Sequence, residues 1–348
     1  MTRSSVRRRL AAAVALACAL SAAGAARAAA PKYTALEITP PFGTNCEPHA
    51  VNSSGQVAGG VFTDATYLVG QGFLTGPGGA GITMVAPLDG GRAELIDIDD
   101  AGDAVGYSAA PGNTTTTSIG RPAATGTVVD LGGIGGVYSV PTAVNHSGQI
   151  VGFAIAADNS LGGYVSRKHL KGPLTPTGVQ VFPQDIAADG AIVGAQLALD
   201  YSGEVAYLTG ANGQGMTLLG SLGGGWSMAL GVNRRHEVVG SSETIDGSTH
   251  AFVTDAGGGR VRDLGVPGSI VQARRINVHG QIVGDAQPGA GAPNWAFVAD
   301  RSGRWWRLDQ QTTLPAGVSL DSAADINDNG QIAARSVDQR CFLLTPVR

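Results

Sequence analysis

Few side chains in this 348-residue chain stand at spacings that suit metal binding or catalysis. The segment from Asp325 to Gly330 reads D-x-N-x-N-G, which is the oxygen-donor order that opens a calcium loop. Asp325, Asn327 and Asn329 are therefore calcium candidates. The set is incomplete, because Ser336 stands where such a loop needs its closing carboxylate.

Nucleophilic and zinc chemistry find little support. The GWSMA segment from Gly225 resembles part of a G-x-S-x-G nucleophile elbow, but that motif requires a following helix and none is predicted here. His146, His236 and His279 lie in separate predicted turns. A zinc ion needs each ligand nitrogen about 2 Å from the metal, and turns of different repeats should lie too far apart for this. We predict no catalytic residue, no resident metal beyond the calcium candidates and no cofactor.

Large aromatic residues that depart from the local sequence pattern are better candidates for recognition. Trp226, Tyr138, Trp305 and Trp306 are the four that we single out as ligand-binding residues. Aromatic rings at such positions stack on sugars or anchor protein partners, and packing inside the fold is the alternative. Because Trp305 and Trp306 are consecutive, a strand would turn them to opposite sides, and we expect one to leave the interior.

A ten-residue phrase that recurs seven times sets the architecture. Its spacing of 42 to 50 residues lies in the range of propeller blades. In most copies Asn or Asp and then Gly provide a turn between β-branched residues, which predicts a β-hairpin. The copies are AVNSSGQVAG from Ala50, DIDDAGDAVG from Asp97, AVNHSGQIVG from Ala143, DIAADGAIVG from Asp185, GVNRRHEVVG from Gly231, RINVHGQIVG from Arg275 and DINDNGQIAA from Asp325.

Two further apolar segments recur in each repeat, so we expect four short strands per repeat. One carries an aromatic residue, as in HAFVTD from His250, and only the second repeat lacks it, having GRPAATG from Gly120. The pattern predicts an all-β, seven-bladed β-propeller of four-stranded antiparallel blades. Six or eight blades, or a β-solenoid, are the alternatives. The first predicted strand, ALEIT from Ala35, and the last, from Cys341, should share one blade.

That shared blade predicts where two cysteines lie. Cys341 opens the last strand, and Cys46 should lie in the connection that leaves the first. Both would then lie on one rim, within reach of a disulfide if their Cβ atoms face each other. A Cys46–Cys341 disulfide is one outcome, and two free thiols are the other.

The first thirty residues have the layout of a secretory signal peptide: arginines, a short apolar run and an A-x-A site. We expect residues 1–30 to be removed and residues 31–348 to form a single propeller domain. Removal of five arginines leaves 18 basic against 27 acidic residues, a net charge of −9. Such a surface repels phosphate backbones, and no other stretch is long enough to span a membrane. We predict neither a nucleic-acid partner nor a membrane span.

One repeat resembles a known family. HAF at His250, followed by DLG at Asp263 and RINVHGQIVG at Arg275, is similar to the HAF repeat family of bacterial extracellular proteins. The resemblance covers the mature chain, although the letters HAF occur only once. It implies a propeller-like repeat fold and export, and it names no reaction.

The sequence thus predicts a periplasmic or extracellular monomer. The primary functional hypothesis is a non-enzymatic binding or scaffold protein whose propeller loops recognise a protein or a glycan. The alternative is a secreted glycan-active enzyme, a lyase or hydrolase, with its site at the mouth of the central channel.

Overall fold

A computed structural model describes residues 30–63, 66–166, 175–197, 203–289 and 291–347. The chain divides into two units, Met1–Pro31 and Lys32–Arg348, and every described strand belongs to the second. The predicted signal peptide lies outside the described residues except for Ala30. Among the residues that the structure describes, no helix has the length and hydropathy needed to cross a membrane.

The second unit is all-β, as predicted, and its strands fall into four classes. Each phrase begins in an inner strand, and these strands are β2 (Asn45–Val51), β6 (Arg92–Ile98), β10 (Gly135–Val144), β14 (Val181–Ile186), β18 (Gly223–Val232), β22 (Ile270–Ile276) and β27 (Leu320–Ile326). The second strands are β3 (Val57–Phe62), β7 (Ala104–Ala109), β11 (Ile150–Ala156), β15 (Ile192–Leu197), β19 (Val238–Thr244), β23 (Gln281–Gln287) and β28 (Ile332–Ser336).

The remaining strands lie outside these two classes. The third strands are β4 (Gly70–Thr75), β8 (Thr116–Arg121), β12 (Leu161–Val165), β16 (Glu204–Thr209), β20 (Thr249–Thr254), β24 (Trp295–Asp300) and β29 (Cys341–Pro346). The fourth strands are β5 (Ile82–Val85), β9 (Val129–Gly132), β13 (Thr175–Val179), β17 (Met216–Leu218), β21 (Val261–Asp263), β25 (Trp305–Arg307) and β1 (Tyr33–Ile38). The two-residue strand β26 (Thr312–Thr313) pairs with β1, and three short 3₁₀ turns are η1 (Pro77–Gly79), η2 (Pro111–Asn113) and η3 (Ala211–Gly213).

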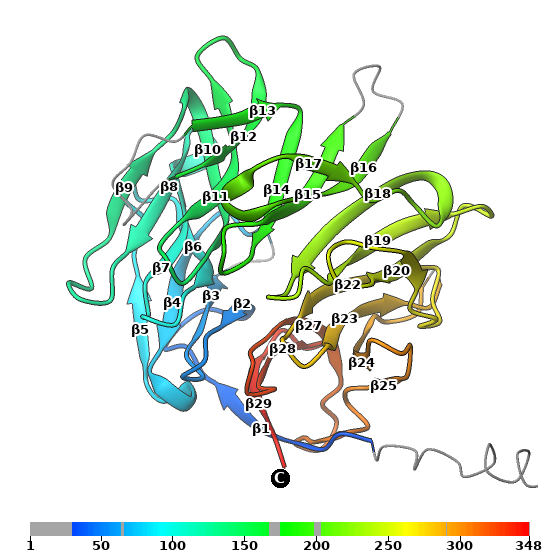
Figure 1. Cartoon of the computed structure of the whole chain (residues 1–348). Coiled ribbons are helices and arrows are strands. Elements are labelled where there is room, and N and C mark those ends of the chain that lie inside the picture. Colours follow the sequence, from blue (N-terminus) through cyan, green and yellow to red (C-terminus); the bar gives the residue numbers. More distant parts are fainter. Residues whose placement is uncertain (1–29, 64–65, 167–174, 198–202, 290, 348) are drawn as a thin grey trace, which may run out of the picture. The chain divides into compact units, whose positions relative to one another are not determined.

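Strands pair antiparallel in the order inner, second, third and fourth, so each repeat forms one four-stranded group. Single parallel pairings such as Gly70 with Arg92 join some neighbouring groups into larger sheets. In Figure 1 the groups fan around a common centre, towards which the inner strands lie. The predicted four strands per repeat are therefore present.

The two ends of the described chain meet in one group. Strand β1 pairs antiparallel with β29 over its whole length, from Tyr33 with Pro346 to Ile38 with Cys341. Figure 1 shows these strands side by side, in blue and red. The pairing of the first strand with the last is thus as predicted from the sequence.

A disulfide joins Cys46 to Cys341, with the two Cα atoms 5.6 Å apart. This confirms the predicted bond but corrects the placement of Cys46, which lies inside the inner strand β2 rather than in a connection. The bond therefore links the third strand of the last group to the inner strand of the first. The connection ends at Thr44, because backbone pairing with β3 already begins at Asn45 and includes Cys46 opposite Val61.

The hydrophobic core lies between neighbouring groups. One aromatic residue on each of six third strands is at most 1% exposed, and these residues are Phe73, Tyr164, Tyr207, Phe252, Phe297 and Phe342. In the second repeat we predicted that the third strand is the GRPAATG segment from Gly120. This prediction is wrong, because the third strand is β8, which begins at Thr116 and ends at Arg121. Ile119 takes the aromatic position there and is fully buried.

Candidate functional site

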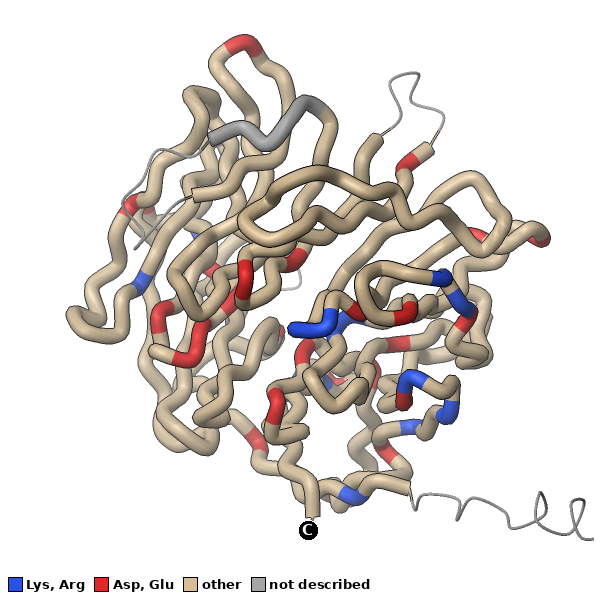
Figure 2. The backbone as a smooth tube through the Cα atoms, in the orientation of Figure 1, with Lys and Arg blue, Asp and Glu red and all other residues tan. Residues whose placement is uncertain are grey.

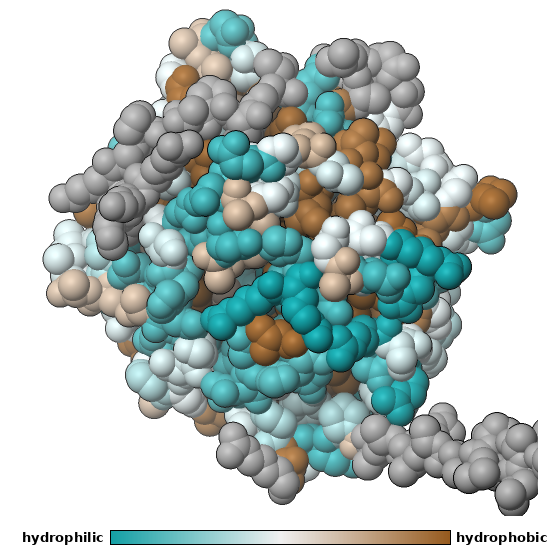
Figure 3. All heavy atoms as spheres, viewed as in Figure 1, coloured by the Kyte–Doolittle hydropathy of each residue, from teal (hydrophilic) through white to brown (hydrophobic). Residues whose placement is uncertain are grey.

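The inner strands surround a central cavity with two ends. At the end formed by the phrase turns, a cavity of about 210 Å³ is lined by residues of all the inner strands, and we call it the turn-side mouth. At the other end, where the inner strands begin, two further cavities form what we call the loop-side mouth. Figure 3 shows hydrophilic residues over the centre of one face of this unit.

A belt of buried asparagines crosses from group to group at the turn-side mouth. Each Asn side-chain NH₂ donates to a backbone carbonyl of the next group, while its Oδ1 accepts from its own turn, as Asn277 does from His279 and Gln281. The five inter-group bonds are Asn52 to Asp99, Asn145 to Ala187, Asn233 to Asn277, Asn277 to Asn327 and Asn327 to Asn52, at 2.7 to 3.1 Å. The last of them returns the belt to its start.

Aspartates complete the belt at the two places where the phrase lacks its Asn. Asp97 Oδ2 accepts from the backbone N–H of Val144 at 2.7 Å, and Asp185 Oδ2 accepts from that of Val232 at 2.9 Å. A third carboxylate, Asp325, accepts from the Val51 N–H at 2.7 Å. The recurring polar residues of the phrase thus tie the groups together as well as shaping the turns.

Replacing Asn277 by Ala is expected to lower the free energy of unfolding by about 2 kcal/mol, because it leaves buried backbone groups without partners. Asn277 is 3% exposed and serves both its own turn and the next group. Urea unfolding would measure the change. Asn329→Ala is the matched control, since Asn329 is exposed and makes one bond to Ser53 with its side-chain NH₂. Equal losses in the two variants would contradict the structural role of the belt.

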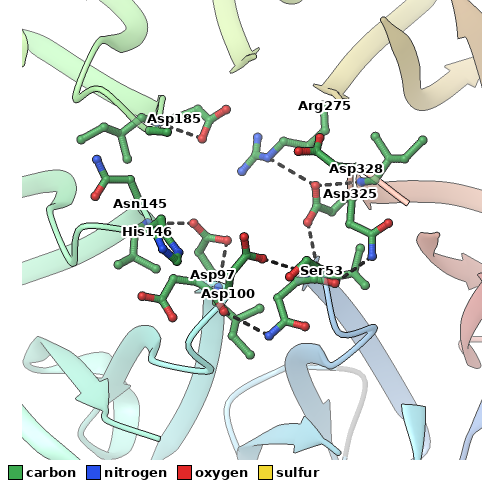
Figure 4. A pocket seen from close by; sticks show the side chains of 18 of the residues that line it. Ser53, Asp97, Asp100, Asn145, His146, Asp185, Arg275, Asp325 and Asp328 are labelled. Atoms are coloured by element: carbon green, nitrogen blue, oxygen red, sulfur yellow. Dashed lines mark hydrogen bonds and ion pairs between the residues drawn. The ribbon is translucent and has the colours of Figure 1, made fainter. Parts of the chain in front are cut away.

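Arg275 closes the base of the turn-side mouth. Figure 4 shows its guanidinium directed into the cavity together with the carboxylates of Asp97, Asp185 and Asp325. Its Nε lies 3.9 Å from Asp325 Oδ1, and Nη1 donates to the Leu230 carbonyl at 2.5 Å. Arg275 also lines one cavity of the loop-side mouth, so its side chain separates the two mouths.

Three carboxylates share this one guanidinium, and burial raises the pKa of two of them, Asp97 and Asp325. Burial raises the pKa of Asp97 to about 8, because the charge of Arg275 and the Val144 hydrogen bond only partly offset it. Repulsion from Asp325 and Asp185 acts in the same direction as burial. At neutral pH the folded protein therefore holds a proton on Asp97 that the unfolded chain would release.

This proton makes stability depend on pH. Between the ordinary value of 3.8 and the folded value of about 8, the folded state binds more protons, so the stabilisation is present at low pH and is lost as pH rises towards 8. We expect Asp97→Asn to flatten the fall in unfolding free energy, which is at most about 1.4 kcal/mol per pH unit. Urea unfolding across this range measures both slopes. The prediction is contradicted if unfolding free energy falls with pH as steeply in Asp97→Asn as in the wild type. It is also contradicted if the exposed control Asp89→Asn flattens the fall.

A β-bulge interrupts every inner strand at one register position. The residue that it leaves unpaired immediately precedes the phrase, and a bulge re-aims such a side chain. Apart from Arg275, these bulged residues are the lining of the inner cavity at the loop-side mouth. They are His49, Ile96, Thr142, Gln184, Leu230, Arg274 and Ala324.

His49 forms a dyad with a buried carboxylate. Its Nε2 lies 3.1 Å from Oε2 of Glu94, whose Oε1 accepts from the Tyr107 hydroxyl. Burial would raise the pKa of Glu94, but hydrogen bonds from His49 and Tyr107 and the charge of Arg92 hold it below its ordinary value. The ionised carboxylate can only accept, so it fixes the His49 proton on Nε2 and leaves Nδ1 as a basic nitrogen.

Arg274 lines the same two cavities as His49. Its Nε donates to the carboxylate of Asp285, whose side chain is only 14% exposed. Asp285 thereby orients the guanidinium, and neither terminal nitrogen of Arg274 has a hydrogen-bond partner among the described residues. A guanidinium fork held in this way suits a planar anion such as a carboxylate.

A second arginine at the loop-side mouth is already satisfied. Arg335 donates to Asp321 through Nε at 3.2 Å and Nη2 at 2.9 Å, and through Nη1 to Glu47. These partners hold the pKa of Arg335 above its ordinary value despite burial. The Arg335 cluster therefore supports the rim, whereas Arg274 keeps free donors.

Two of the four predicted aromatic residues lie on inner strands. Tyr138 on β10 and Trp226 on β18 occupy equivalent positions, each five residues before its phrase, and both are half-buried. The Tyr138 ring is 6.1 Å from that of Phe153, which is 6.1 Å from that of Phe182. These three rings form an aromatic row that runs from β10 through β11 to β14.

The other two predicted aromatics lie on the fourth strand β25, away from the cavities. Trp305 packs against the core between the groups of β20 and β24, and Trp306 packs against the core next to β29. Their rings face opposite sides as expected, but both are half-buried and neither is fully exposed, because a core lies on each face of this sheet. This corrects the expectation for the pair, and their role in ligand binding stays a prediction.

The calcium candidates do not direct their oxygens to one point. Asp325 faces Arg275, Asn327 Oδ1 accepts from the backbone N–H groups of Asn329 and Gln331, and Asn329 donates to Ser53. Of the turn histidines, His146 lines the turn-side mouth, and His236 pairs with Asp189 at 2.9 Å. Within the described residues no group of three His, Cys, Asp or Glu could hold a metal ion.

The sequence alone did not single out His49, Glu94 or Arg274. A signal was nevertheless present, because the residue before the phrase differs in every copy while the phrase itself is repeated. Variation within an otherwise constant repeat marks a position that packing does not fix. Without the register, however, nothing showed that this position faces the central cavity.

Similar solved structures are known for the fold. A propeller domain of the Trilobed protease from Pyrococcus furiosus matches with a TM-score of 0.55 and 8% identity, over 87% of this chain and 94% of that one. The fold is that of a β-propeller. An oligogalacturonate lyase in complex with manganese matches with a TM-score of 0.56 and 14% identity, over 90% and 93%.

A structure of prolyl endopeptidases also matches, with a TM-score of 0.56 and 14% identity, over 87% of this chain. The chain spans about half the length of those enzymes, since the match covers 50% of that chain. No protein-family model matches the sequence, and no curated protein does. At these identities the similarities establish the fold alone.

Proposed function

We propose that this protein is a glycan-active enzyme, a lyase or hydrolase, whose active site is the loop-side mouth. The observation that carries the proposal is that His49, held by a carboxylate through Nε2, and Arg274, held by a carboxylate through Nε, line the same cavities. Bulges hold both side chains on the inner strands of a disulfide-linked scaffold. General acid–base chemistry requires this kind of rigid placement.

Each residue has a distinct role in the proposal. His49 accepts a proton through Nδ1, either from water or from a carbon of the sugar, and Glu94 stabilises the imidazolium that forms. Tyr107 and Arg92 keep Glu94 ionised. Arg274 binds negative charge on the substrate or on the developing transition state. The aromatic row that includes Tyr138 offers ring faces on which sugars stack.

The lyase named above supports a glycan substrate. That protein acts, by its name, on oligogalacturonate, and its match covers nearly the full length of both chains. The peptidases share only a part of their length with this chain. The lyase therefore matches this chain over more of its own length than the peptidases do, which favours a glycan substrate in the proposal.

Binding without catalysis is the second candidate. Aliphatic residues stand exposed at the ends of strands on the loop side, with Ile245 88%, Val137 63% and Val69 50% exposed. We take these residues as the candidate contacts for a protein partner, because apolar residues that lie together on a surface mark interaction sites. A binder would retain its ligand unchanged, whereas the enzyme releases products from it.

The finer architecture and the location are also proposals. We propose seven blades that close into a ring, supported by the asparagine belt that returns to Asn52 and by the β1–β29 pairing. Export of a monomeric HAF repeat protein to the periplasm or the medium is consistent with the disulfide. Figure 2 shows acidic and some basic residues around the centre, with further Lys and Arg residues on the side where Figure 1 labels β20 to β25.

The test is a panel of neutral and acidic glycans incubated with the purified mature protein. Release of new reducing ends or of unsaturated products, abolished in His49→Gln, would support the enzyme. Retention of a glycan or protein without any product would favour the binder. Products that are released equally by His49→Gln would place the activity elsewhere.

A further inference from the structure

Arg274 narrows the substrate class of the proposed enzyme. Three features distinguish it from the other cations of the loop-side mouth. Its Nε is held by the buried carboxylate of Asp285, its terminal nitrogens are without partners among the described residues, and 39% of its side chain is exposed. Arg335 lacks the second feature, because all three of its nitrogens donate to carboxylates.

The surroundings favour one anion with defined geometry over diffuse negative charge. His49 and Ala324 line both loop-side cavities together with Arg274, and Asn294 adds an amide to the outer one. Glu47 and Asp321 occupy the remaining rim, and both are bound to Arg335. A sugar that carries several charged groups would meet these acids, whereas a sugar with a single carboxylate can reach the fork of Arg274.

We infer that the substrate is a uronic-acid glycan whose carboxylate binds the terminal nitrogens of Arg274, and that the reaction is β-elimination. This inference rests on the proposed function. A guanidinium bound to the carboxylate stabilises negative charge that develops there when the neighbouring carbon loses its proton. His49 is the base that shares the cavity, so cation and base serve two adjacent atoms of one sugar.

The step balances without a co-reactant. His49 Nδ1 takes the proton from the carbon that bears the carboxylate, and the electron pair of that C–H bond forms a carbon–carbon double bond. The bond from the next carbon to the glycosidic oxygen breaks. The imidazolium then returns its proton to that oxygen. The products are an unsaturated uronate end and a new hydroxyl end, and the step involves no net oxidation or reduction.

The experiment compares polygalacturonate with the same polymer methyl-esterified, and with neutral dextran, using the mature protein. We expect ultraviolet-absorbing unsaturated ends from polygalacturonate and a lower rate from the esterified polymer. Arg274→Gln should lower kcat/KM on polygalacturonate about 10- to 100-fold, the loss of a charged hydrogen-bond pair. Arg274→Lys should recover part of it, because the charge remains without the fork.

Arg304→Gln is the matched control, since Arg304 is similarly exposed, at 43%, but pairs with Asp300 outside the loop-side mouth. Melting temperatures verify that the variants fold. If Arg274→Gln does not fold, Asp285→Asn tests the same guanidinium, because it removes the charge that holds Arg274 Nε. If the protein releases reducing ends from dextran, and Arg274→Gln releases them at the same rate, the inference is overturned while the proposed function stands. No product from any glycan, with wild type and His49→Gln alike, would overturn both.

Discussion

Replacing His49 by Gln is expected to lower the rate of glycan cleavage by about 100- to 10,000-fold, which is the contribution of general acid–base catalysis. Gln can still donate to Glu94, so the buried carboxylate keeps a partner and the fold is retained. It cannot accept a proton at neutral pH. The loss should therefore fall mainly on kcat, with a smaller change in KM.

A second histidine provides a matched control. His250 pairs with Asp263 through Nδ1 at 2.7 Å, and its side chain is 29% exposed, as is that of His49. His250 lies on the third strand β20 and lines neither loop-side cavity. His250→Gln should thus retain full activity. If both variants cleave glycans at the wild-type rate, His49 is not the base.

Glu94 supplies a further check on the same dyad. Glu94→Gln removes the charge that stabilises the imidazolium and leaves the His49 tautomer unfixed. We expect a loss in the same direction as for His49→Gln, and the double variant should lose little more than His49→Gln alone. Independent, multiplying losses would show that the two residues do not act as a unit.

Much of the fold follows from the repeat. The recurring Asn and Gly dictate hairpin turns, and the flanking β-branched residues dictate strands, so four strands per repeat could be predicted. The first and last segments lack their partners within one repeat, which predicted the β1–β29 pairing and, through it, the Cys46–Cys341 bond. These features depend on local patterning that every repeat reinforces.

What could not be predicted depends on register and on neighbouring groups. The bulge before each phrase inserts one residue, and only its observed position turns His49 and Arg274 into the cavity. We expected one ring of Trp305 and Trp306 to leave the interior, because consecutive residues of a strand face opposite sides of the sheet. Which faces are covered is decided by the packing of whole sheets, here on both sides of β25.

Substituting Ser for both Cys46 and Cys341 is expected to lower the free energy of unfolding by up to about 5 kcal/mol. The bond spans a sequence separation of 295 residues, so its loss restores much conformational freedom to the unfolded chain. It also releases β2 from β29, next to the group in which the first and last strands pair. Urea unfolding of oxidised wild type and of the double Ser variant measures the loss.

An equivalent position elsewhere in the fold separates the contribution of loop length from that of position. Ser118 on β8 and Ser139 on β10 occupy the same register as Cys341 and Cys46, and their hydroxyl oxygens lie 2.6 Å apart. Cysteines introduced there in the double Ser variant would close a far shorter loop, which predicts a recovery of about 3 kcal/mol.

The size of that recovery decides between two roles of the native bond. If the new disulfide raises the unfolding free energy by about 3 kcal/mol, and the variant stays less stable than the wild type by the remainder, loop length governs the stabilisation. No gain from a verified Ser118→Cys/Ser139→Cys disulfide would contradict this. It would mean that the native bond acts by its place, because it fastens the first group to the last group, in which the two ends of the chain are held by the β1–β29 pairing.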